Sequence, residues 1–315
     1  MKRIILVILI ISVGLFSKDI TFSEEITADG EIINLLVKDG NIYATTSRSV
    51  VDVFDLKTKK LVKKIKFDKV RDFFGDLSDV RIFSVDKMGD RLLFASQGTK
   101  GFSRVYLYYD NKLHLIFDEN DKMAIMKVRF MDKDKIIFSL LSSEIILYDL
   151  KNKKNIYDKQ ASGSKFSDFK LNKAKTKLLL SDESGSGKIV DTKTGNVIKK
   201  FYGQNLDNTY QVDYKNNIIA IASKDRRCGI YKEDGSMAYH KVSNFLVYSV
   251  GLSPDGKYCA YPSDDKNNIT IFRVNDRENL YTLVKNESPV SNIVFINDKE
   301  LITSNGSKIK FWSLK

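Results

Sequence analysis

The sequence predicts an all-β protein, a seven-bladed β-propeller closed by its N-terminal strand. Three observations lead to this fold class. An apolar strand pattern recurs about every 41 residues, Gly, Asn and Asp occupy the same turn positions in successive repeats, and one N-terminal segment has no repeat of its own.

The repeat is clearest in its third strand, which ends in an aromatic or branched side chain. After one long first interval, these terminal positions are spaced by 40, 42, 41, 41 and 40 residues, the period of a four-stranded WD40 blade. Seven copies predict seven WD40-like blades, and we expect the aromatic side chains to wedge between blades. The terminal positions are Phe54, Tyr108, Tyr148, Val190, Tyr231, Phe272 and Trp312.

Turn residues fall between the first and second strands of each repeat, as in 39–41, 132–134, 216–217, 254–257 and 297–299. Gly, Asn and Asp tolerate positive φ, so they suit tight hairpins. Each repeat is therefore expected to be an antiparallel sheet.

Two segments lie outside the regular repeats. Residues 19–26 are expected to supply the missing outer strand of the seventh blade, which closes the ring and removes exposed strand edges. Residues 68–77, which carry Phe73 and Phe74, form an insertion between the first two blades. This insertion either contacts a partner or packs back onto the blades.

The first residues are typical of a secretory signal peptide. Residues 1–3 are basic at two positions, residues 4–16 form an apolar run, and a small residue, Ser17, precedes a polar segment. The run is short for a membrane span, which needs about 20 residues. We expect residues 1–17 to be a signal peptide, residues 18–315 a single propeller, and the mature protein periplasmic; the alternative is an uncleaved anchor.

Composition agrees with a globular, strand-rich protein. The chain of 315 residues has 43% hydrophobic residues, 11% aromatic residues and three prolines. Its net charge of +12 comes from Lys scattered through turns with Asp and Glu between them, which is not typical of a nucleic-acid-binding surface. The two cysteines, Cys228 and Cys259, fall in neighbouring blades; they are expected to be buried thiols, and a disulfide is the alternative.

The sequence lacks the usual residues of an enzyme site. His114 and His240 occupy outer-strand positions of different blades, so they cannot form a three-histidine zinc site, and no H-E-x-x-H or C-x-x-C motif is present. Residues 251–255 lack the second glycine of a nucleophile elbow, and residues 185–188 are only a fragment of a phosphate-binding loop. We expect no catalysis, no cofactor and no metal.

Blade five carries the most distinctive turns. The loop 204–210 leads into it, and residues 223–227 form its second turn, so both should lie on one face. Adjacent arginines on a propeller rim suit an acidic protein partner. The candidate partner-binding residues are Gln204, Asn205, Asp207, Arg226 and Arg227, with Phe73 and Phe74 of the insertion. The spacing of Ser223, Asp225 and Tyr231 is that of an internal WD40 hydrogen-bond network.

Residues 143–149, 164–169, 203–214, 225–227 and 248–254 resemble NapL, the WD40-like accessory protein of periplasmic nitrate reductase. The repeats depart from eukaryotic WD40 units because they lack the Gly-His pair. The resemblance implies a periplasmic protein whose partners are nitrate reductase subunits or maturation factors. We expect the protein to be a monomer.

The sequence therefore leads to a non-catalytic periplasmic scaffold as the function. Two alternatives stay open. One is a propeller of another envelope or cytochrome-assembly pathway, and the other is a quinoprotein-like propeller that binds a ligand in its central channel.

Overall fold

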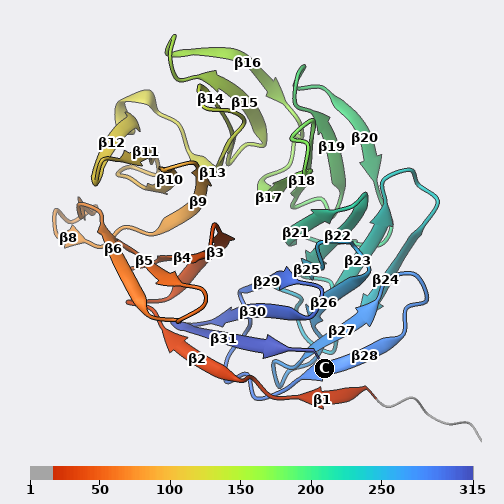
Figure 1. Ribbon diagram of the computed structural model, residues 1–315. Coiled ribbons are helices and arrows are strands. Elements are labelled where there is room, and N and C mark those ends of the chain that lie inside the picture. Colours follow the sequence, from red (N-terminus) through yellow and green to blue (C-terminus); the bar gives the residue numbers. More distant parts are fainter. Residues whose placement is uncertain (1–16, 315) are drawn as a thin grey trace, which may run out of the picture.

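The computed structural model describes residues 17–314, which form a ring of seven antiparallel sheets around a central channel (Figure 1). The predicted signal peptide falls almost entirely on residues 1–16, outside the described part. Blade one consists of β3 (Ile32–Lys38), β4 (Asn41–Thr46), β5 (Val50–Asp55) and β6 (Leu61–Lys66). Blade two consists of β9 (Ile82–Met88), β10 (Arg91–Gln97), β11 (Ser103–Tyr109) and β12 (Lys112–Phe117). Blade three consists of β13 (Ile125–Phe130), β14 (Lys135–Leu140), β15 (Glu144–Asp149) and β16 (Lys154–Gln160).

The remaining blades follow the same order from the channel outward. Their strands are β17 (Phe166–Leu171), β18 (Lys177–Asp182), β19 (Gly187–Asp191) and β20 (Val197–Phe201) in blade four; β21 (Thr209–Lys215), β22 (Ile218–Ser223), β23 (Arg227–Lys232) and β24 (Ala238–Val242) in blade five; β25 (Gly251–Leu252), β26 (Tyr258–Pro262), β27 (Ile269–Arg273) and β28 (Asn279–Leu283) in blade six; and β29 (Asn292–Asn297), β30 (Glu300–Asn305) and β31 (Lys308–Ser313) in blade seven. A seven-bladed, WD40-like β-propeller is thus confirmed.

The N-terminal segment closes the ring, as predicted, but it does so with two strands instead of one. Strand β2 (Glu24–Thr27) pairs antiparallel with β31 and completes blade seven. Strand β1 (Lys18–Ile20) adds a parallel fifth strand to the outer edge of blade six, beside β28 (Figure 1). The expectation of a single strand over 19–26 was therefore wrong in detail, because the chain turns between the two blades at residues 21–23.

The core lies between blades. Six of the seven terminal side chains of the third strands are aromatic, and each is at most 9% exposed, as expected for wedges between neighbouring sheets. Trp312 is 2% exposed, and its indole N–H donates to Thr303 Oγ1 at 2.9 Å. Apolar contact between sheets therefore holds the ring together.

Aspartates on the inner strands add a second link between blades. Each accepts a backbone N–H from the inner strand of the following blade, so a buried donor of that strand is satisfied by a charged acceptor. The three donor–acceptor pairs are Phe130 N to Asp86 (2.8 Å), Val212 N to Asp168 (3.1 Å) and Leu252 N to Asp213 (2.9 Å).

Candidate protein-docking face

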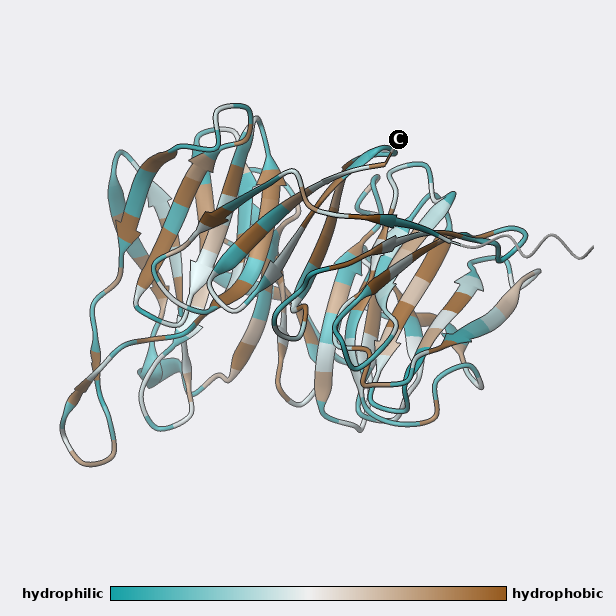
Figure 2. Cartoon of the chain, turned by 90° about the horizontal axis from the view of Figure 1, so that it is seen from below, coloured by the Kyte–Doolittle hydropathy of each residue, from teal (hydrophilic) through white to brown (hydrophobic). Residues whose placement is uncertain are grey.

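One face of the ring is formed by the turns between second and third strands and by the loops that join one blade to the next. The insertion between blades one and two lies on this face and forms a hairpin of β7 (Val70–Arg71) and β8 (Leu77–Ser78). Figure 2 shows the hairpin projecting beyond the other loops, on the side opposite the end of the chain. We call this side the hairpin face.

Asp72 organises the tip of the hairpin. Its side chain accepts hydrogen bonds from the backbone N–H of Phe74 (2.9 Å) and of Asp76 (3.0 Å) and from the Ser78 hydroxyl (3.0 Å). These bonds hold the pKa of the Asp72 carboxyl below its ordinary value, although partial desolvation opposes them. Gly75 takes φ +90° at the turn, a conformation that favours glycine.

The hairpin tip presents two aromatic rings to solvent. Phe73 is 96% exposed and Phe74 is 86% exposed, and their ring centroids lie 5.6 Å apart in an edge-to-face arrangement. Of the two expectations, packing back onto the blades holds only for the base of the insertion, where Val70 is 5% exposed in the core between blades one and two, and it is wrong for the tip.

In blade five, the loop 204–210 and the turn 223–227 lie side by side, as predicted. Leu206 N–H donates to Asp225 Oδ2 (2.7 Å), and Lys224 N–H donates to the carbonyl of Asn208 (2.8 Å). Ser223 donates its hydroxyl to Asp225 Oδ1, and the Tyr231 hydroxyl accepts from Gln204 N–H at 3.1 Å. These bonds make the surface around the turn rigid.

The two neighbouring arginines differ in their surroundings. Arg227 is half-buried, its Nε lies 3.7 Å from Asp225 Oδ2, and its backbone N–H donates to Asp225 Oδ1. Arg226 is exposed at the apex of the turn with φ +65°, and among the described residues no ion pair involves it. Only Arg226 has the surroundings expected of a free contact residue.

Among the other candidates, Asn205 does not lie on the surface. It is 3% exposed, and its amide donates to the carbonyls of Ile221 and Arg227 (3.3 Å each). A Cβ at Gly229 would lie 2.0 Å from Asn205 Oδ1, so this position needs glycine. The prediction that Asn205 contacts a partner was therefore wrong, because its side chain fastens the loop to blade five.

Gln204 and Asp207 remain accessible to different degrees. Gln204 Oε1 lies 2.8 Å from Nδ1 of His240, whose pKa is lowered by partial burial and by the charge of Arg227. Asp207 is exposed and lies 3.9 Å from the ammonium group of Lys224. Asp207 can reach a partner directly, whereas Gln204 is largely engaged within the blade.

An apolar strip beside Arg226 was not predicted from the sequence. Leu206 is 63% exposed on one side of the turn, and Phe245 is 38% exposed on the other. Ser243 N–H donates to the carbonyl of Arg226 (2.8 Å), which places the loop with Phe245 against the turn. Phe245, Tyr248 and Tyr210 then follow one another at centroid distances of 6.3 and 5.1 Å towards the channel. Only the pairing of loops in space shows that these side chains are neighbours.

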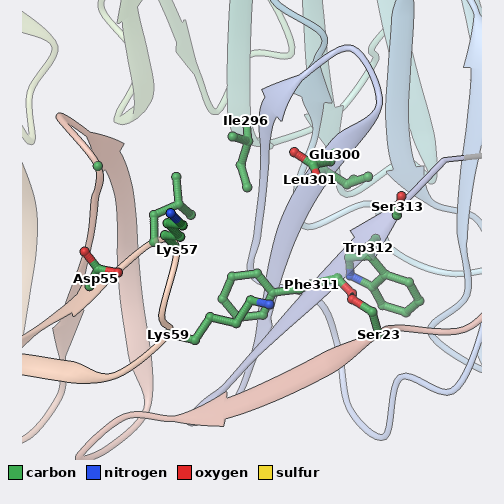
Figure 3. A pocket seen from close by; sticks show the side chains of 12 residues that line it. Ser23, Asp55, Lys57, Lys59, Ile296, Glu300, Leu301, Phe311, Trp312 and Ser313 are labelled. Atoms are coloured by element: carbon green, nitrogen blue, oxygen red, sulfur yellow. The ribbon is translucent and has the colours of Figure 1, made fainter.

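The opposite face has a pocket of about 480 Å³ at the seam between blades seven and one (Figure 3). Lys59 lies across the ring of Phe311, with Nζ 4.9 Å from its centroid, and pairs with Glu24 at 2.5 Å. Trp312 and Leu301 also line the pocket. These contacts join β2 and blade seven to blade one, so the residues of the pocket serve ring closure.

The central channel contains a smaller cavity of about 210 Å³, lined with inner-strand residues of the blades. The buried ion pair of Lys127 and Asp168 forms part of its wall. Sites for cofactor-sized ligands usually enclose about 300–1,000 Å³. The cavity is therefore small for a quinone-type cofactor.

Within residues 17–314, no group of three or more His, Cys, Asp or Glu side chains is arranged to hold a metal ion. In this same part of the chain, no helix has the length and hydrophobicity that crossing a membrane requires.

No family model matches the sequence, and no curated protein matches it either. Among solved structures, the chain is similar to the β-propeller domain of Myceliophteria thermophila Cps50 (Swd1). The TM-score is 0.72, the identity is 14%, and the alignment covers 93% of this chain and 99% of that one. This likeness shows the fold, a WD40-like β-propeller, whereas the resemblance to NapL finds no support in these comparisons.

Proposed function

We propose that this protein is an exported, non-catalytic scaffold that docks protein partners through its hairpin face and supports the periplasmic nitrate reductase system. The observation that carries the docking role is the pair of exposed phenylalanines on a hairpin held by its own hydrogen bonds. Rigid aromatic side chains bury a large area with little loss of conformational entropy, which is typical of interaction hot spots.

The nitrate reductase role rests on the resemblance of residues 203–227 and the neighbouring stretches to NapL. A pull-down from periplasmic extract of nitrate-respiring cells tests it, with reductase subunits or maturation factors as the expected partners. A deletion strain should then grow poorly on nitrate and normally on other electron acceptors. A defect on all acceptors, with no reductase subunit captured, would instead indicate another envelope or cytochrome-assembly pathway.

Replacing Phe73 and Phe74 with Ser should abolish partner capture and leave the melting temperature unchanged. Exposed side chains away from special features contribute within about 0.5 kcal/mol to stability, whereas a buried interface aromatic contributes about 2 kcal/mol or more to binding. Capture efficiency and thermal unfolding measure the two effects. Ile198→Ser is the matched control, since Ile198 is 54% exposed on the outer strand β20. Equal capture by the double variant and the control would rule out the hairpin as a docking element.

Arg226→Glu should weaken partner capture at least about tenfold without lowering the melting temperature, because the guanidinium is free and exposed. Arg227→Glu should lower the melting temperature, because it places a carboxylate beside Asp225 and removes the ion pair at 3.7 Å. Arg226→Lys keeps the positive charge and therefore shows whether charge alone is sufficient for capture. If Arg226→Glu unfolds at a clearly lower temperature, its role is structural and the assignment fails.

A further inference from the structure

The two cysteines of the chain lie against each other across the boundary between blades five and six. Cys228 is on β23 and Cys259 is on β26, and their Sγ atoms are 3.9 Å apart. Both residues are free thiols, and both are 0% exposed within the apolar core between the two blades. Their contact is therefore set by the packing of the sheets.

We propose that Cys228 and Cys259 form a disulfide when the chain folds in an oxidising compartment. The chain has only these two cysteines, so one pairing is available. The cross-strand neighbour of Cys228 on β22 is Ala222, so the side chain that β22 places opposite Cys228 is a small one. The cross-link adds a covalent bond between two blades that otherwise meet through apolar contacts and a few hydrogen bonds, such as that of Leu252 N–H to Asp213.

Burial determines when the bond can form. The thiolate is the reactive species in thiol–disulfide exchange, and burial raises the pKa of the Cys259 thiol well above its ordinary value. The folded thiols are therefore resistant to added oxidants, and oxidation must precede the packing of blade six on blade five. The same burial protects the finished disulfide from reductants.

With oxidised glutathione as the oxidant, the chemistry takes two steps. One cysteine thiolate attacks a glutathione sulfur, which forms a protein–glutathione disulfide and releases one glutathione thiolate. The second cysteine thiolate then attacks the protein sulfur of that mixed disulfide and releases the other glutathione thiolate. Two protein thiols lose two protons and two electrons, and one glutathione disulfide gains them to become two thiols.

The test uses purified, reduced protein of residues 18–315 in two samples. One is kept native and incubated with oxidised glutathione, and the other is unfolded in guanidinium and refolded in the same glutathione buffer. Free thiols are then alkylated and counted by mass spectrometry, and the peptides are mapped. We expect the refolded sample to have no free thiol and one Cys228–Cys259 peptide, and the native sample to keep both thiols. Two free thiols, or glutathione attached separately to each cysteine, in the refolded sample would overturn the proposal.

A thermal measurement provides an independent readout. The cross-link closes a loop of 31 residues, so the oxidised protein should melt several degrees above the reduced protein. The Cys228→Ala, Cys259→Ala variant should melt at one temperature in both buffers. The expectation that the bond forms in the cell depends on export, whereas the refolding result needs neither export nor a nitrate reductase partner. The two proposals can therefore fail separately.

Discussion

Deleting residues 18–27 should destabilise the propeller by on the order of half its folding free energy. The deletion removes β1 and β2, including three partly buried apolar side chains, Ile20, Phe22 and Ile26, that pack on the sheets of blades six, seven and one. At the lower range of about 1.5 kcal/mol for each, the loss is about 4–5 kcal/mol, against a total of about 5–15 kcal/mol for a native protein. A decrease of about 10–20 °C in the melting temperature is expected, as measured by calorimetry or circular dichroism.

The deletion also exposes the outer edge of β31. Phe22 lies edge-to-face on Trp312 with centroids 5.8 Å apart, and the ammonium group of the fully buried Lys310 lies 4.5 Å from the centre of the Phe22 ring. An unpaired, apolar strand edge promotes aggregation, so the soluble yield should fall as well. Deleting residues 18–20 alone is the control. Blade six keeps four paired strands without them, and the decrease should be much smaller. Equal melting temperatures for the full deletion and the intact chain would exclude closure by β2.

The architecture could be predicted from the sequence because a propeller repeats one local pattern. The spacing of Phe54, Tyr108 and the later terminal residues fixed the number of blades, and the unmatched N-terminal segment indicated the closure. The parallel pairing of β1 with blade six could not be foreseen. Three residues carry too little pattern to specify a partner strand, and the pairing depends on where the chain lies after it leaves blade seven.

The candidate site was less predictable, for two physical reasons. Burial of a loop side chain depends on distant neighbours: Asn205 is buried because Gly229 leaves room for it, 24 residues away in the sequence. The sequence also does not show which loops of adjacent blades lie close together. The loop that carries Phe245, for example, contacts the turn that carries Arg226. A repeat pattern places both loops on one face, but it does not show which side chains meet there.

Asp168→Leu should destabilise the protein by about 3–5 kcal/mol, the expected loss when one partner of a buried ion pair is removed. Lys127 and Asp168 are 7% and 5% exposed, and Asp168 also accepts the N–H of Val212 at 3.1 Å. The variant would leave the buried amino group of Lys127 and the buried N–H of Val212 without this acceptor. Denaturant unfolding measures the effect. The exposed pair Lys165–Glu183, 3.1 Å apart, is the matched control, and Glu183→Leu should change stability by no more than about 1 kcal/mol.

A double-variant cycle separates the ion pair from the hydrogen bond to Val212. Lys127→Met with Asp168→Leu should recover most of the loss, since two apolar side chains leave no buried charge uncompensated. The remaining deficit of about 1–3 kcal/mol is the cost of the unsatisfied Val212 N–H. If the double variant is no more stable than Asp168→Leu alone, the loss arises from packing instead of from the isolated charge.

The pH dependence gives this interpretation a signed test. Burial lowers the pKa of Lys127 to about 7, and the charge of Asp168 only partly offsets this effect. A lysine in the unfolded chain titrates near pH 10.4, so between about pH 7 and pH 10 the unfolded state binds more protons at this position. Stability contributed by Lys127 must therefore rise with pH across that window, and it must be constant below the window, where both states are protonated. Lys127→Met lacks this titration, so the stability difference between the wild type and Lys127→Met should shift in favour of the wild type as the pH rises. If this stability difference does not change between pH 7 and pH 10, the pKa of Lys127 is close to its ordinary value in the folded protein. The channel wall would then be more hydrated than the burial of these side chains indicates.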